Sequence, residues 1–287
     1  MSVQKMWEVS LNILQIPLFI AIIAVLAKKT GKQRGLFAAF FMFALMALAL
    51  EDIYWITYDI LRPDTWMPFA ADEFAGSAAI LLLGSMLATK LEKKSGLRIL
   101  ELLFSVAFMA GHAGLWIAWS GEWFQDIVSA IPYVYFVYVL LSGMKETKAL
   151  TRAGTYLALF ICTFVIALDF IALPLDEGTA NLLYNINYAV LNGTTVFLFV
   201  KIIRMGRKQN AGDNVREKAL FLTFALYLWS RLVVYMSSEV FYNIGLILHI
   251  LTFPLMLWAV IRVMDVGRGE KETREADGFP AQNGGVT

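Results

Sequence analysis

Apolar residues along the chain fall into nine long runs, separated by short polar or charged stretches. An α-helix needs about 20 consecutive apolar residues to cross the hydrocarbon core of a membrane. The pattern therefore predicts an all-α integral membrane protein, a bundle of about nine transmembrane helices. The expected spans are residues 7–27, 36–61, 69–89, 99–119, 126–144, 154–175, 181–203, 219–238 and 242–263.

Two of these spans are weaker than the rest. The seventh is interrupted by Asn185, Asn187 and Asn192, and the eighth carries Arg231 in its interior. An alternative with seven spans and two re-entrant segments therefore stays open.

Composition narrows the class of protein further. The chain of 287 residues is 59% hydrophobic and 16% charged, whereas a soluble domain is about half apolar and roughly a quarter charged. These values exclude a soluble enzyme and a disordered chain, and the formal net charge of +1 offers no field for nucleic acid. The single cysteine, Cys162, lies inside an apolar run and can form no intrachain disulfide.

The two ends of the chain are expected to differ. The N-terminal residues lack the basic region and small-residue cleavage site of a signal peptide, so the run 7–27 is interpreted as the first span. Residues 1–264 are expected to form a single transmembrane domain. Residues 265–287 are polar and rich in glycine and charge, and are expected to be a disordered cytoplasmic tail. Cytoplasmic signalling or energising would then require a partner protein.

Charged residues alternate between the loops. Assigning the basic loops to one side gives that side 21 Lys and Arg against 10 Asp and Glu, and the other side 3 against 13, so that +11 and −10 cancel to +1. Lys and Arg concentrate in cytoplasmic loops. We therefore expect a plasma-membrane protein with its N-terminus outside and its C-terminus in the cytoplasm.

Polar residues within the spans gather in the outer halves, whereas the inner halves are apolar. Charges at membrane depth are costly, about 2.5–3.5 kcal/mol each on insertion scales, and persist where they face a cavity or pair with each other. This distribution indicates a polar, aromatic-lined cavity open to the outside. The residues expected to bind a ligand there are Glu51, Asp52, Tyr54, Tyr58, His112, Tyr135, Asp169, Asn185, Asn187, Arg231 and His249.

The adjacent acids Glu51 and Asp52 are the sharpest feature of this set. Neighbouring residues on a helix point about 100° apart, so the two cannot chelate one ion unaided. Arg231 is the only base deep within a span, and its expected partner is Glu51, Asp52 or Asp169. Such a pair is either a structural ion pair or part of a site for a charged ligand.

The leading hypothesis for function is binding of a small cationic or zwitterionic ligand from outside, for sensing or transport. Tyrosine faces beside acids suit an organic cation. A second hypothesis is an intramembrane metal-dependent hydrolase acting on a lipid, in which His112, His249 and an acid activate water. A third is a structural or accessory membrane subunit, in which the asparagines and the ion pair only hold helices together.

The expected topology can be tested by labelling single cysteines in intact cells. Cysteine at Thr65 or Gly178 should react with an impermeant reagent from outside, because both lie in acidic loops. Cysteine at Lys94 or Asn210 should react only after permeabilisation. The opposite pattern would overturn the orientation of every span.

Overall fold

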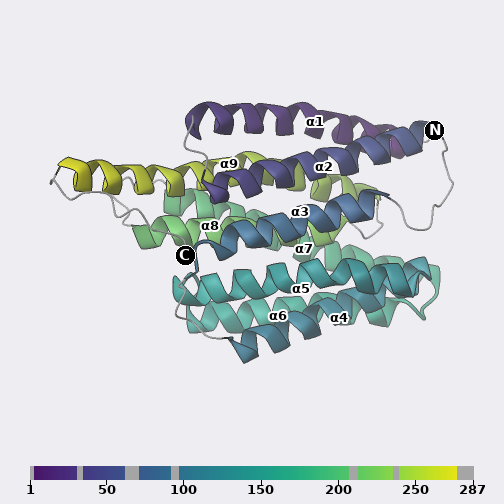
Figure 1. Ribbon diagram of the computed structural model, residues 1–287. Coiled ribbons are helices and arrows are strands. Elements are labelled where there is room, and N and C mark those ends of the chain that lie inside the picture. The colour runs from purple at the N-terminus through teal and green to yellow at the C-terminus, as the bar shows by residue number, and fades with distance from the viewer. Residues whose placement is uncertain are drawn as a thin grey trace.

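The computed structural model describes residues 3–30, 35–61, 71–91, 97–206, 213–234 and 239–276. Within these ranges the chain is all-helical and contains nine α-helices and no strand. The helices lie side by side in one bundle (Figure 1). Their bounds are α1 Val3–Thr30, α2 Leu36–Leu61, α3 Ala71–Ala88, α4 Ile99–Ser120, α5 Trp123–Glu146, α6 Arg152–Ala172, α7 Glu177–Gly206, α8 Asp213–Val234 and α9 Glu239–Ala276.

Each expected span overlaps one helix, which confirms a helical, multi-pass membrane architecture. Seven helices, α1, α2, α4, α5, α6, α7 and α9, contain stretches long and apolar enough to cross a membrane. The apolar part of α3, Glu73–Ala88, is shorter, and α8 opens with the charged residues Asp213, Arg216, Glu217 and Lys218. Although α7 carries three asparagines, it is a continuous helix of 30 residues.

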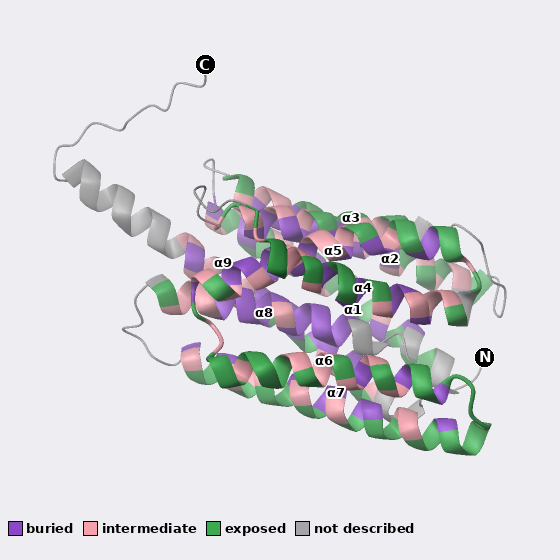
Figure 2. Ribbon diagram, turned by 90° about the horizontal axis from the view of Figure 1, so that it is seen from below, coloured by how far each residue is buried: buried purple, intermediate pink, exposed green. Residues whose placement is uncertain are grey.

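Neighbour contacts connect eight helices into a closed circuit. The circuit runs through α1, α2, α3, α5, α4, α6, α7 and α9, and returns to α1. The remaining helix, α8, contacts α9, α7 and α5 and lies in the middle of the bundle (Figure 2). The fold is thus a ring of helices around one central helix.

Burial along α8 confirms that it is central. From Ala219 to Arg231 every residue except the half-buried Ala225 is buried, so all sides of the helix are covered. A helix that is buried on all sides must be surrounded by protein. Phe224, for example, packs edge-on against Phe41 of α2, with ring centroids 6.0 Å apart.

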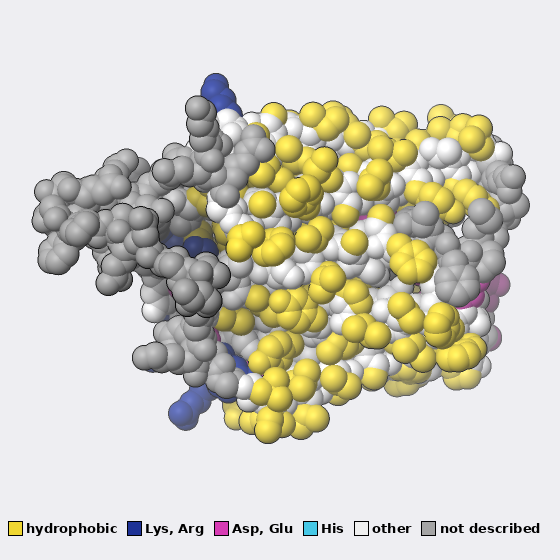
Figure 3. Space-filling model, in the orientation of Figure 1, with side chains coloured by type: hydrophobic (Ala, Val, Ile, Leu, Met, Phe, Trp, Pro, Cys, Tyr) yellow, Lys and Arg dark blue, Asp and Glu magenta, His cyan; other side chains and the backbone are white. Residues whose placement is uncertain are grey.

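The outer surface of the ring has the opposite character. Large apolar side chains are exposed along the outer helices, including Leu100 of α4, Phe160 of α6 and Phe197 of α7. Figure 3 shows such side chains over most of the face in view, with Lys and Arg at one end and Asp and Glu at the other. An extensive exposed apolar surface between two polar ends is what a lipid bilayer requires.

Local signals explain where two of the helices begin. Thr151 accepts a hydrogen bond from the backbone N–H of Gly154 at the start of α6, and Asp176 accepts one from the N–H of Thr179 at the start of α7. Such side chains satisfy amide groups that the first helical turn leaves unpaired. Hydrogen bonds from the side chain and backbone of Thr179 also lower the pKa of Asp176.

The last helix is longer than the sequence suggests. A disordered tail is expected from residue 265, but α9 continues to Ala276. Its final residues include Glu270, Lys271, Glu272 and Arg274, residue types with a high helix propensity. The expectation of a disordered tail stays a prediction, and residues 277–287 lie outside the described residues.

Packing of α5 against α8 depends on a glycine. A Cβ atom at Gly143 would lie 2.0 Å from a ring carbon of Phe221, which is buried in α8. We expect Gly143→Ala to lower the melting temperature of the purified protein, because overpacking a core costs about 1–3 kcal/mol. Gly193→Ala is the control, since a Cβ atom there has no neighbour within 4 Å. Equal melting temperatures for the two variants would contradict the central packing of α8.

Candidate functional site

The main candidate site is an ion pair between the central helix and the ring. An Nη2 atom of Arg231 in α8 lies 2.5 Å from Oε1 of Glu51 in α2. Both residues are buried, each with 7% of its surface exposed. Of the three partners that the sequence proposes for Arg231, the structure selects Glu51.

A tyrosine from a third helix completes the contact. Nε of Arg231 donates a hydrogen bond of 2.8 Å to the hydroxyl of Tyr133 in α5. The ring of Tyr133 also packs edge-on against Trp116 of α4, with centroids 5.7 Å apart. Arg231 thus uses two sides of its planar guanidinium group, one toward a carboxylate and one toward a hydroxyl.

A fourth helix provides the space for this pair. A Cβ atom at Gly76 of α3 would lie 2.7 Å from Nη2 of Arg231 and 3.0 Å from Oε1 of Glu51. Any larger residue there would displace the two charged groups. Helices α2, α3, α5 and α8 therefore converge on one point, and Gly76 allows α3 to approach it.

Asp52 brings a second acid to this region. It is half-buried, and its Oδ2 atom has no hydrogen-bond partner among the described residues. The adjacent Glu51 occupies the guanidinium of Arg231. The region therefore holds two carboxyl groups for one guanidinium, and a buried acceptor without a donor.

His249 lies beside the same part of α8. Its Nδ1 atom is 2.9 Å from the hydroxyl oxygen of Ser230, the residue before Arg231. The imidazole stacks on Tyr227 and packs edge-on against Phe253, with centroids 5.3 Å and 5.1 Å away. His249 thus joins α9 to the central helix next to the ion pair.

A second polar pair lies between α6 and α7. Nδ2 of Asn187 donates hydrogen bonds to Oδ1 of Asp169, at 2.7 Å, and to the carbonyl oxygen of Val165, at 3.3 Å. Both side chains are buried, and Oδ2 of Asp169 and Oδ1 of Asn187 have no partner among the described residues. Asp169 and Asn187 therefore form a unit of their own, separate from the pairing of Arg231.

The other candidate residues occupy varied positions. Tyr54 and Tyr58 stack along α2 with centroids 5.7 Å apart. Tyr135 packs against Gly84 of α3, where a Cβ atom would lie 2.8 Å from its ring. His112 is buried in α4 with its ring edge-on to Phe108, and Asn185 is exposed.

Two residues at the ion pair are missing from the candidate set that the sequence predicts. Tyr133 accepts a hydrogen bond from Arg231, and Gly76 lies against its guanidinium group.

The described part of the chain contains no candidate metal site. There, no three His, Cys, Asp or Glu side chains gather closely enough to hold a metal ion. Each of the two histidines instead packs against aromatic rings. The described residues therefore offer no support for the hydrolase hypothesis.

The energetic role of the ion pair can be measured with a double-mutant cycle. Glu51→Gln and Arg231→Met should each lower the melting temperature strongly, because breaking a buried pair costs about 3–5 kcal/mol when one charge is left without its partner. The double variant should recover part of that loss, since it leaves neither charge unpaired. If the two losses simply add, the residues are not coupled in the folded protein.

Comparison with known proteins identifies no relative for this chain: no family model matches it, and neither the curated proteins nor the solved structures give a significant match.

Proposed function

We propose that the chain binds a small zwitterionic or cationic ligand at Glu51, Asp52, Tyr133 and Arg231, for sensing or transport across the plasma membrane. The observation that carries this proposal is the contact of Arg231 with Glu51 at the central helix, 2.5 Å long and shielded from solvent. Intramembrane charges are rare and are candidates for function by default.

The chemistry of the pair matches such a ligand. A ligand carboxylate can replace Glu51 on the guanidinium of Arg231, where planar N–H groups bind carboxylates in pairs. The ammonium group of the ligand can then donate hydrogen bonds to the carboxyl groups of Glu51 and Asp52. Asp52 has an oxygen without a donor among the described residues. Asp52 places a second carboxyl group beside the contact of Glu51 with Arg231, so the positive group of a ligand would have two acids to contact.

Access to the pair requires the helices to move. Arg231, Glu51 and Tyr133 are nearly excluded from solvent, so a ligand must separate α2 or α3 from α8. Gly76 of α3 lies against both charged groups and has no side chain. A ligand that enters between α3 and the ion pair at this point would therefore displace the fewest side-chain atoms. In this proposal the opening faces outward, the ligand enters from outside, and the shift of α8 is passed to a cytoplasmic partner or completes transport.

The experiment is a thermal-shift screen of the purified full chain with amino acids, polyamines and quaternary amines. A ligand at a hundred times its Kd stabilises the folded state by about 2.7 kcal/mol, so a true ligand should raise the melting temperature measurably. The shift should vanish in Glu51→Gln and fall in Asp52→Asn. The control is Asp176→Asn, an exposed acid whose change in charge is the same and whose capping bond asparagine can keep.

Two results would count against the proposal. If no compound of these classes stabilises the wild-type protein, the ion pair only holds the helices together, and the hypothesis of a structural or accessory subunit is favoured. If a compound stabilises the protein equally in Glu51→Gln and Asp176→Asn, it binds elsewhere.

A further inference from the structure

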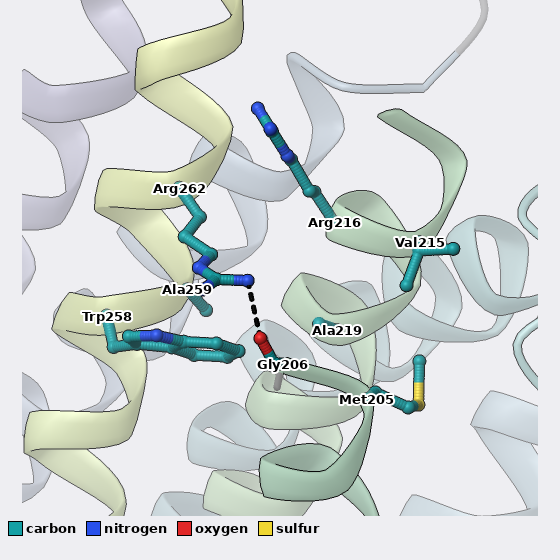
Figure 4. Close-up of a pocket in the computed structure, with 8 residues that line it drawn as sticks. All are labelled: Met205, Gly206, Val215, Arg216, Ala219, Trp258, Ala259 and Arg262. Atoms are coloured by element: carbon teal, nitrogen blue, oxygen red, sulfur yellow. Dashed lines mark hydrogen bonds between the residues drawn. The ribbon is translucent and has the colours of Figure 1, made fainter. Parts of the chain in front are cut away.

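A pocket lies at the basic end of the bundle, far from the Arg231 contact. It is formed by the end of α7, the start of α8 and the last span turns of α9 (Figure 4). The pocket is shallow and open to solvent at the protein surface. Its lining residues are Met205, Gly206, Val215, Arg216, Ala219, Trp258, Ala259 and Arg262.

The first basic group of the pocket is held in place by two contacts. The guanidinium of Arg262 lies 4.8 Å from the ring centre of Trp258. Its Nη1 atom donates a hydrogen bond of 2.8 Å to the carbonyl oxygen of Gly206, the last residue of α7. A Cβ atom at Gly206 would lie 2.4 Å from the Trp258 ring, so glycine lets this ring reach the end of α7. Arg262 is thus fixed with further N–H donors to offer.

The second basic group comes from the first turns of α8. Arg216 leaves that helix toward α9, and its guanidinium lies above the contact of Arg262 with Gly206 in this view (Figure 4). Within the part of the chain that the structure describes, no ion pair satisfies either guanidinium. Two guanidinium groups that line one pocket, and that no described ion pair satisfies, favour an anion there.

The surroundings of the pocket indicate which anion fits. Gly206 ends the candidate span of α7, and Trp258 and Arg262 lie in the last turns of the candidate span Asn243–Met264. The pocket therefore lies where a membrane-spanning bundle meets the headgroup layer, and its remaining lining residues, such as Met205 and Val215, are apolar. A lipid with an anionic headgroup matches such a lining, because its charged group can contact the arginines and its acyl chain the apolar residues.

We propose that this pocket binds the phosphate group of an anionic phospholipid, through the guanidinium groups of Arg216 and Arg262. The lipid glycerol and upper acyl chain would lie against Trp258 and Met205. This site does not depend on the proposed ligand at Glu51 and Arg231, because Arg216 and Arg231 are separated by 15 positions on α8, about 22 Å along the helix axis.

The test measures binding of dioleoyl phosphatidylglycerol to the purified full chain in detergent, by native mass spectrometry and by thermal unfolding. Dioleoyl phosphatidylcholine and inorganic phosphate are titrated in parallel. We expect phosphatidylglycerol to bind more tightly than phosphatidylcholine and to raise the melting temperature. Arg216→Gln should weaken phosphatidylglycerol binding about fivefold, because one basic residue near a membrane surface contributes about 1 kcal/mol.

Two further variants separate this pocket from its surroundings. Arg262→Lys keeps the charge but loses the planar group that stacks on Trp258, and should also weaken phosphatidylglycerol binding. Arg204→Gln removes an exposed charge of α7 that does not line the pocket, and should leave binding unchanged. An equal loss in Arg204→Gln and Arg216→Gln would overturn the proposal, because the attraction would then come from the whole basic end.

Two outcomes would contradict the proposal that the ligand is an anionic phospholipid. If inorganic phosphate raises the melting temperature as much as phosphatidylglycerol at the same concentration, and does so only with Arg216 present, the pocket takes free phosphate and the lipid is not its ligand. If phosphatidylglycerol and phosphatidylcholine bind equally to wild type and to Arg216→Gln, the pocket has no anion site.

Discussion

The enclosure of α8 is the constraint on which the rest of the structure depends. From Ala219 to Arg231 the helix is surrounded by other helices and cannot turn a side chain toward water. Its one deep charge, Arg231, must therefore find its counter-charge inside the protein. Glu51 supplies it at 2.5 Å, and Tyr133 takes a second N–H group. A buried pair offsets the loss of hydration only when its geometry is good and its other donors are bonded. The helices α2, α3 and α5 consequently meet α8 at the guanidinium group of Arg231.

Enclosure also explains why α8 differs from its neighbours in composition. Ring helices need an apolar outer face for lipid, and they expose residues such as Phe160 and Phe197. The central helix meets no lipid, so it can carry threonine, serine and arginine among its apolar residues, as at Thr223, Ser230 and Arg231. Its charged start belongs to the basic end of the bundle. The same helix therefore carries residues of both the basic end and the ion pair.

The sequence predicts the helices well and their neighbours poorly. Apolar runs of membrane length are a strong and local signal, which is why nine expected spans overlap nine helices in the described residues. The partner of Arg231 is limited by charge to three acids, but choosing Glu51 over Asp169 requires knowing that α2, and not α6, supplies the partner. The contacts of Tyr133 and Gly76 with the ion pair follow only from that arrangement.

A packing device and a binding site differ in what they leave unsatisfied. An ion pair that only joined helices would need one acid for one base, and every buried acceptor around it would be used. Here the acid Asp52 adjoins the pair with an oxygen that lacks a donor among the described residues. The Asp169–Asn187 unit of α6 and α7 likewise retains two acceptor oxygens without donors there. In both places a buried carboxyl oxygen lacks a donor among the described residues. The positive group of a ligand would bring N–H donors to such oxygens, which agrees with the class of ligand proposed for the contact of Arg231 with Glu51.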